Sequence, residues 1–279
     1  MTSRLAYLGP EGTFSYKAAQ SLLVHQPQFK AIPFDCMHKV LTAVEKGQTE
    51  YAIVPLENLV EGTISEPLDF LVQSDSVKIV SELIEAIQLD VIGLKGTPLE
   101  EVTEVISHAN PVGQSRHFVR LRMPHSKEIL APSTVAAIEM VAERNDQHVV
   151  AIGNSSVNER YGVVTLAKNV GDVKHNQTRF VLLQKHILND LDMSEKISFV
   201  FSLPKDQPGG LYKIMGLLQQ INLTKIESRP SKDILGSYYF FIDIQGDYGD
   251  QAIRKTLKAV EENTETFKIL GAYKEIKSC

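Results

Sequence analysis

The sequence has few cysteines and no hydrophobic run long enough to cross a membrane. Its two cysteines, Cys36 and Cys279, are widely separated, so no disulfide framework is expected. The longest apolar runs have the length of strands and fall well short of the ~20 residues that span a bilayer. The N-terminal run breaks at Gly9-Pro10 before the apolar core of a secretory signal could form. These absences predict a cytoplasmic protein without a membrane partner.

Basic runs, phosphate-binding glycine motifs and metal-ligand spacings are also missing. The net charge is −5 and no long basic run occurs, so we expect no nucleic-acid partner. Neither common glycine-rich phosphate fingerprint is present. The eight histidines do not fall at zinc-ligand spacing with cysteine or carboxylate residues. We therefore expect no metal and no cofactor.

The composition is that of an ordinary globular protein, with 43% hydrophobic and 23% charged residues. At 279 residues, a prior of about 150 residues per domain suggests two domains. Strand-like and helix-like runs alternate through residue 185, which predicts an α/β domain over residues 1–185 with mostly parallel sheets. Its long apolar runs over 77–94 indicate a crossover between two lobes, and we expect the second crossover near 150–165.

The pattern changes after a polar stretch at 189–196, which we interpret as a domain boundary. Residues 196–279 show strand and helix periodicities in the order βαββαβ. This order predicts a ferredoxin-like second domain.

Five loops of the first domain lead from a strand towards a helix and carry hydroxyl or amide residues. They are residues 9–15, 57–63, 108–111, 132–134 and 153–156. Each loop would expose helix N–H groups and a hydroxyl, which suits a carboxylate. For any one of these loops, plain N-capping, worth about 1 kcal/mol per helix, is the favoured explanation. Together, the five loops favour a small organic anion bound between the lobes.

Thr178-Arg179-Phe180 opens an apolar run directly after a polar loop, at a strand position where α/β proteins often place chemistry. Ordinary β-propensity also explains a threonine there. Capping does not explain Glu57 and Asn58 at the end of an apolar strand, where an unpaired carboxylate is costly. Arg179 offers a planar fork to a carboxylate.

Ordered motifs over nearly the whole chain resemble the monofunctional prephenate dehydratases, a family with a C-terminal ACT regulatory domain. The matching segments are residues 8–15, 55–58, 61–63, 107–108 with 114, 133–137, 151–153, 176–180, 208–212 and 227–230. The resemblance implies a catalytic domain like the type II periplasmic-binding lobes and a cofactor-free conversion of prephenate to phenylpyruvate in phenylalanine biosynthesis. Gly210 departs from the alanine usual in that family.

The resemblance also implies roles for individual residues. Thr178 would be the catalytic donor. Because an alcohol gives up its proton poorly, we expect Thr178 to act as a hydrogen-bond donor or relay with a carboxylic acid such as Glu57 behind it. The substrate-binding residues would be Asn58, Ser107, Gln114, Arg179, Phe180, Thr13, Ser15, Ser133 and Thr134.

The C-terminal domain would sense L-phenylalanine and pair with its copy in a homodimer or homotetramer. Its effector residues would be Gly209, Gly210, Leu211, Glu227, Ser228, Arg229 and Pro230. Two alternatives stay open: an arogenate dehydratase, and a non-catalytic sensor that binds a small anion or amino acid.

Overall fold

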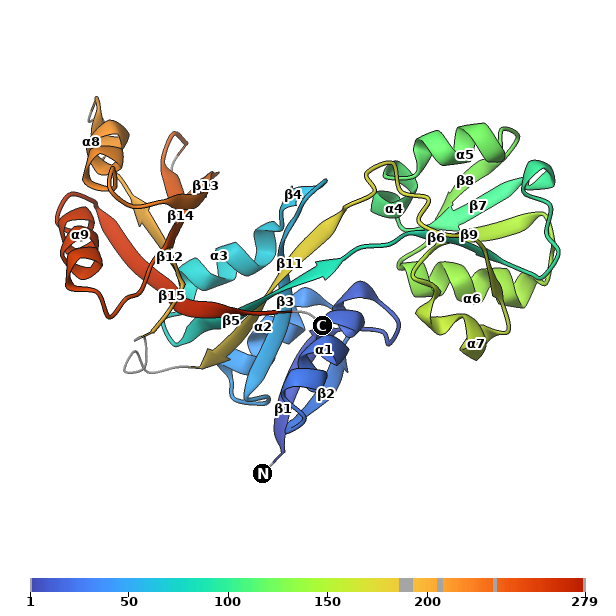
Figure 1. Cartoon of the computed structure of the whole chain (residues 1–279), viewed down its shortest axis with the longest axis horizontal. Coiled ribbons are helices and arrows are strands. Elements are labelled where there is room, and N and C mark those ends of the chain that lie inside the picture. Colours follow the sequence, from blue (N-terminus) through green and yellow to red (C-terminus); the bar gives the residue numbers. More distant parts are fainter. Residues whose placement is uncertain (1, 186–192, 205–207, 233–234, 278–279) are drawn as a thin grey trace.

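The computed structural model describes residues 2–185, 193–204, 208–232 and 235–277. Residues 189–192, the first half of the polar stretch that we interpret as a domain boundary, and Cys279 lie outside the described residues. Figure 1 shows three parts in a row: a first lobe in the centre, a second lobe beside it, and a C-terminal unit on the opposite side.

The first lobe is built on five main strands in the order β2-β1-β3-β11-β5. Strands β2, β1 and β3 are parallel, whereas β11 runs antiparallel to both β3 and β5. Buried residues of α1 cover one face of this sheet, and those of α2 and α3 cover the other. The elements are β1 (Ser3–Leu8), α1 (Phe14–His25), β2 (Phe29–Phe34), α2 (Met37–Glu45), β3 (Tyr51–Asn58), β4 (Gly62–Thr63), α3 (Ser65–Gln73), β5 (Val77–Ala86) and β11 (Gln177–Lys185).

The second lobe has its own sheet, in the order β10-β6-β9-β7-β8. Strand β9 lies at its centre and is buried along its whole length, with α6 packed against it. The elements are β6 (Asp90–Gly93), the 3-10 turn η1 (Leu99–Glu101), β7 (Glu104–Ser107), α4 (Ala109–Gly113), α5 (Arg116–Arg122), β8 (Lys127–Leu130), α6 (Thr134–Arg144), β9 (Val149–Gly153), the 3-10 turn η2 (Ser155–Val157), α7 (Asn158–Tyr161) and β10 (Val164–Ala167).

Two crossovers connect the lobes. The first leads from β5 to β6 and agrees with the prediction for residues 77–94. The second runs through residues 168–176, from β10 to β11, and not near residues 150–165 as expected. That expectation was wrong because β9 and β10 both pair within the second lobe. The sheets are also mixed, because the strands next to the crossovers are antiparallel to their neighbours.

The C-terminal unit has the predicted βαββαβ order, with antiparallel strands in the order β13-β14-β12-β15. Helices α8 and α9 pack on one face of these strands around a core that includes Phe199, Phe201 and Ile242. The elements are β12 (Lys196–Ser202), α8 (Gly210–Leu217), β13 (Leu223–Pro230), β14 (Tyr238–Gln245), α9 (Gln251–Glu261) and β15 (Thr266–Ile276).

The C-terminal unit is joined to the first lobe by a shared sheet and a shared core. Strand β15 pairs in parallel with β5, so a ten-stranded sheet runs through both parts. The strands approach so closely that a Cβ atom at Gly271 would lie 2.2 Å from the carbonyl oxygen of Ile79. The two parts also share a hydrophobic core, because Phe241 and Leu270 belong to the same buried cluster as Leu71 of α3. The position of the C-terminal unit is therefore fixed by packing against the first lobe.

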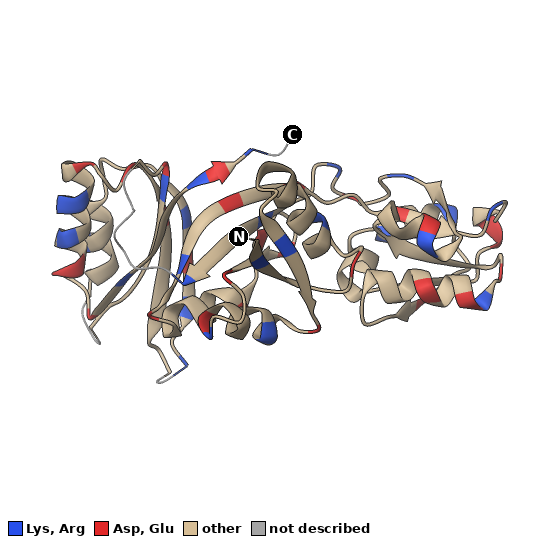
Figure 2. Cartoon of the chain, turned by 90° about the horizontal axis from the view of Figure 1, so that it is seen from below, with Lys and Arg blue, Asp and Glu red and all other residues tan. Residues whose placement is uncertain are grey.

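Acidic and basic residues are interspersed over the helices and strands (Figure 2). None of the described helices is long and apolar enough to cross a membrane. Within the same residues, no three His, Cys, Asp or Glu side chains gather in a group that could hold a metal ion.

Candidate active site

A cleft of about 540 Å³ lies between the two lobes. The N-terminus of α1 and the end of β3 supply first-lobe residues, and the starts of α4 and α6 supply second-lobe residues. The polar lining residues are Thr13, Ser15, Asp35, Asn58, Glu61, His108, Asn110, Gln114, Ser133, Thr134 and Thr178.

Helix N-termini and neutral groups dominate the donors of this cleft. Among the described residues that line it, none is lysine or arginine. Thr13 caps α1 by accepting a hydrogen bond from the Tyr16 N–H, and Ser133 caps α6 by accepting from the Ala136 N–H. The two helices belong to different lobes, so each lobe offers a side-chain-capped, positive helix end to a bound anion.

Thr178 lies at the start of β11 and is paired in register with Asn58 at the end of β3. Nδ2 of Asn58 donates to Oγ1 of Thr178 over 2.8 Å. The orientation of the Asn58 amide is fixed because its Oδ1 accepts from the backbone N–H groups of Val60 and Glu61. The Thr178 oxygen therefore acts as an acceptor towards Asn58, which leaves its own O–H to donate elsewhere.

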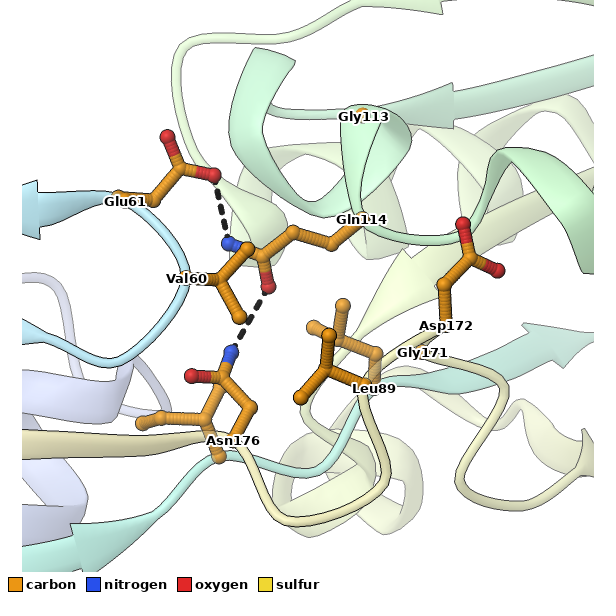
Figure 3. A pocket seen from close by; sticks show the side chains of 10 residues that line it. Val60, Glu61, Leu89, Gly113, Gln114, Gly171, Asp172 and Asn176 are labelled. Atoms are coloured by element: carbon orange, nitrogen blue, oxygen red, sulfur yellow. Dashed lines mark hydrogen bonds between the residues drawn. The ribbon is translucent and has the colours of Figure 1, made fainter.

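A chain of hydrogen bonds continues from Asn58 across the hinge, as Figure 3 shows in part. Asn58 also donates to Oδ1 of Asn176 over 3.0 Å, and Asn176 donates to Oε1 of Gln114 over 2.9 Å. Nε2 of Gln114 then donates to Oε1 of Glu61 over 2.7 Å. Gln114 belongs to the second lobe and Glu61 to the first, so this chain joins the lobes beside Thr178.

The chain borders a second cavity of about 300 Å³ that adjoins the cleft. Glu61, Gln114, Ile87 and Leu89 line both spaces. The second cavity therefore continues the cleft along the hinge.

The structure brings most of the predicted site residues together at the cleft. These are Thr13, Ser15, Asn58, Gln114, Ser133, Thr134, Thr178 and Phe180. Phe180 is only 1% exposed and also belongs to the core beneath α1, so it forms a wall of the cleft and packs in the interior.

Arg179 does not reach the cleft, contrary to the sequence-based expectation. Successive residues of a strand point to opposite faces, so Arg179 points away from the face that carries Thr178 and Phe180. Its Nε lies 2.6 Å from Glu82 and its Nη1 lies 2.5 Å from Asp243. A guanidinium committed to two buried carboxylates has no fork left for a substrate.

The expectation that Glu57 lies behind Thr178 was wrong for the same reason. It is paired in register with Arg179 and shares that face of the sheet. Its carboxylate lies 2.8 Å from Nζ of Lys225 and 3.7 Å from Nη1 of Arg179. Glu57 is thus partnered by cations and does not lie behind Thr178.

Ser107 and the loop at 153–156 also lie outside the cleft lining. Ser107 is fully buried, and its Oγ donates to the carbonyl of Ile152 over 2.5 Å. It holds β7 to β9 and does not contact the cleft. In the 153–156 loop, Asn154 and Ser155 bond to Gly12 and Asp90.

The sequence argument for individual residues missed Asn176, Glu61, His108 and Asn110. Glu61, His108 and Asn176 lie in loops next to a strand, and Asn110 lies in the first turn of α4. Asn176 and Glu61 also flank the residues that were singled out. Polarity in those loops was visible in the sequence. The sequence did not show which of these side chains face the cleft, because that depends on how the two lobes pack against each other.

The predicted effector residues lie at one end of the C-terminal unit. Gly209 has φ +80° and precedes α8, which begins at Gly210. The end of β13 lies at this end of the unit, since Ser202 and Arg229 both pair with Tyr239. The Arg229 guanidinium, however, bonds to Asp69 and Ser65 of α3, so it faces the first lobe and not α8.

The protein has two α/β lobes, and the cleft between them is lined by helix N-termini and by an oriented hydroxyl. These features are those of a two-lobed α/β protein that binds a small anion. The family model for prephenate dehydratase matches residues 5–187. The chain belongs to the prephenate dehydratase family.

Individual relatives agree with this assignment. A prephenate dehydratase from Methanocaldococcus jannaschii is 34% identical, over 98% of this chain and 98% of that protein. A bifunctional chorismate mutase/prephenate dehydratase from Aquifex aeolicus is 35% identical, over 97% of this chain and 73% of its own length. The crystal structure of a prephenate dehydratase from Arthrobacter aurescens in complex with L-Phe superposes with a TM-score of 0.85 at 28% identity, covering 97% of this chain and 89% of that one.

Proposed function

We propose that this chain is a lyase that converts prephenate to phenylpyruvate. In this reaction the bond between the ring and its carboxylate breaks, and its electron pair enters the ring. The C–O bond on the opposite side of the ring breaks with its electrons, so CO₂ and hydroxide leave and the ring becomes aromatic. Aromatisation drives the step, and the protein must hold two carboxylates and assist the departing hydroxide.

Thr178 is suited to assist that departure. Its oxygen accepts a hydrogen bond from Asn58, so its O–H is free to point at the substrate. As negative charge develops on the leaving oxygen, a preorganised donor stabilises it without reorganising. An alcohol is a weak acid, so Thr178 acts by hydrogen bonding to the leaving oxygen and keeps its proton, and the hydroxide is released to solvent.

The two substrate carboxylates would lie at the N-termini of α1 and α6. Each helix end favours an anion by roughly 0.3–1 kcal/mol in exposed sites and up to ~2 kcal/mol where partly buried. These contributions are modest, so exclusion of water by the facing lobe is needed to strengthen them. Gln114, Asn110 and Ser15 supply further neutral groups in the same cleft.

The position of Thr178 is the observation that carries this proposal. Its hydroxyl lies at an interlobe cleft with a fixed donor behind it, in a chain of the prephenate dehydratase family. A protein that only binds its ligand has no evident need for such an oriented hydroxyl.

Incubation of the purified chain with prephenate tests the proposal, with phenylpyruvate absorbance as the readout. Arogenate is run in parallel, with formation of phenylalanine as its readout, because its side chain bears an amine in place of the ketone. We expect turnover of prephenate by the wild-type chain and at least a hundredfold slower turnover by Thr178→Val. Turnover of arogenate alone would reassign the substrate. Binding of either compound without turnover would identify the chain as a sensor.

We further propose that the C-terminal unit is an ACT domain that binds L-phenylalanine near Gly209, Gly210 and Leu211 at the start of α8, with Ser228 of β13 on the same side. Gly209 and Gly210 leave backbone N–H groups free of side-chain crowding, which suits an amino-acid carboxylate. The Arthrobacter relative, crystallised with L-Phe, supports this choice of effector.

We propose that the regulated enzyme is a cytoplasmic homodimer or homotetramer. We also keep the prediction that it is monofunctional, with dehydratase activity and no second activity. Calorimetry with L-phenylalanine should show saturable heat, and light scattering should report a mass of two or four chains. The absence of binding heat would contradict the effector proposal.

A further inference from the structure

Arg179 forms the centre of a buried polar cluster that includes residues of both the first lobe and the C-terminal unit. Its Nε donates to Glu82 on β5, its Nη1 to Asp243 on β14, and its Nη2 to the hydroxyl of Tyr273 on β15. The exposed fractions of all four side chains are below a tenth, so solvent does not screen these contacts.

Every carboxylate oxygen in the cluster has a partner. The second oxygen of Glu82 accepts from Lys196, and the second oxygen of Asp243 accepts from Ser198. Because the single proton of Ser198 is given to Asp243, the Tyr273 hydroxyl donates to Ser198 over 2.6 Å. Strands β5, β11, β12, β14 and β15 are therefore tied together by one continuous network.

The charges of this network depend on one another. Burial alone lowers the pKa of the Arg179 guanidinium, but the neighbouring Tyr273, Asp243 and Glu82 together raise it above its ordinary value. Removing one partner of a buried ion pair leaves the other charge uncompensated, which is costly. The guanidinium therefore follows its partners when they move.

Arg179 also lies between two residues of the cleft. Thr178 and Phe180 are its chain neighbours, and both line the cleft on the opposite face of β11. The pairing of β11 with β3 is irregular between Arg179 and Phe180, whereas its pairing with β5 is regular through these residues. A displacement of the Arg179 side chain would be passed directly to the Thr178 backbone.

We propose that Arg179 is a positioning residue through which the C-terminal unit controls where the Thr178 hydroxyl lies. Asp243 and Tyr273 come from the C-terminal unit, and they hold the guanidinium from the side opposite the cleft. An effector that shifts β14 or β15 moves these two anchors and so misplaces Thr178. This inference rests on the proposed dehydratase activity and names the route by which that activity is regulated.

Isosteric variants test the route, because deletion of Arg179 itself would leave the buried Asp243 carboxylate without a cation and Glu82 with Lys196 alone. Asp243→Asn removes the charge that holds Nη1, and Tyr273→Phe removes only the hydroxyl that accepts from Nη2. Lys268→Met is the matched control: it breaks the hydrogen bonds from β15 to Val72 and Ser74 at the same junction, without contacting the Arg179 cluster.

The measurements are kcat and KM for prephenate with and without L-phenylalanine, and calorimetric binding of L-phenylalanine. We expect Asp243→Asn to lower kcat about tenfold and Tyr273→Phe about threefold, with KM within about threefold of wild type. Both variants should still bind L-phenylalanine but lose most of the inhibition that it causes. Lys268→Met should keep the wild-type kcat and the wild-type inhibition.

The outcomes separate this inference from the function on which it rests. A wild-type chain that does not turn over prephenate would overturn the proposed function, and this inference with it. Wild-type turnover together with unchanged kcat and inhibition in Tyr273→Phe and Asp243→Asn would overturn the inference alone. An equal loss in Lys268→Met would also overturn it, since any loosening of the junction would then have the same effect. If Asp243→Asn does not fold, Tyr273→Phe alone decides.

Discussion

Asn58 and Thr178 face each other across β3 and β11, with Nδ2 of Asn58 2.8 Å from Oγ1 of Thr178. The amide cannot turn round, because its oxygen accepts from the N–H groups of Val60 and Glu61 over 2.9 and 3.0 Å. A tight turn after β3 therefore fixes the direction of a hydroxyl proton on β11. This relationship makes the role of Thr178 open to test by small substitutions.

Thr178→Val replaces the hydroxyl with a methyl group of similar size. We expect kcat for prephenate to fall by ~10²–10³, with KM within a few-fold, because the lost hydrogen bond acts mainly in the transition state. Thr178→Ser keeps the hydroxyl and should retain most of the activity. Steady-state kinetics on both variants decide the matter, and wild-type turnover by the valine variant would remove Thr178 from the mechanism.

Asn58→Asp keeps the oxygen that the turn needs but removes the donor to Thr178. The Thr178 hydroxyl would then donate to the new carboxylate and no longer to the substrate. We expect kcat to fall by roughly 10², a loss of the size expected for one preorganised donor. Asn110→Asp is the control, since it adds a carboxylate to the same cleft without contacting Thr178. It should raise KM while kcat changes little, and an equal fall in kcat for both variants would point to charge repulsion.

Much of the fold could be predicted from the sequence because the spacing of apolar residues along the chain indicates its helices and strands. The crossover after β5 and the βαββαβ order of the C-terminal unit both follow from runs of apolar residues. The return crossover could not be found this way. Strand β9 is an apolar run like any other, and only its pairing partners show that it belongs to the second lobe.

The loops that form the candidate site could be predicted from the sequence, but the face of the sheet to which each side chain points could not. Thr178, Asn58 and Gln114 reach the cleft as expected, whereas Glu57 and Arg179 point to the other face of the sheet. Side chains alternate along a strand, so these neighbours had to diverge. The sequence does not tell which of two adjacent polar residues faces the ligand, because the opposite face is also polar where the C-terminal unit packs.

Lys78 gives the junction between β5 and β15 a measurable pH dependence. Its Nζ donates to the carbonyl of Ile269 over 2.6 Å, and burial, assisted by the charge of Lys268, lowers its pKa to about 8. Between about pH 8 and the unfolded-state pKa near 10.5, the unfolded chain binds the proton and the folded chain does not. Stability from this group therefore rises with pH in that window.

Lys78→Met has no such titration, so the wild-type Tm minus the variant Tm should increase from pH 8 to pH 10. Thermal melts of both proteins at several pH values provide the measurement. A difference that stays flat or decreases over this range would show that Lys78 is not held with a lowered pKa.

Glu61 and Gln114 provide a test of whether the hydrogen-bond chain across the hinge matters as a chain. Gln114→Glu places two carboxylates together where an amide now donates over 2.7 Å, and we expect kcat/KM to fall about tenfold or more. Glu61→Gln keeps an acceptor for Gln114 and should remain close to wild type.

The double variant Glu61→Gln/Gln114→Glu reverses the direction of the bond, and the new carboxylate still accepts from Asn176. If the lobes are held by this contact, the double variant recovers most of the lost kcat/KM. If Gln114 works only by contacting the substrate, the double variant stays as impaired as Gln114→Glu, because the substrate meets the same glutamate in both.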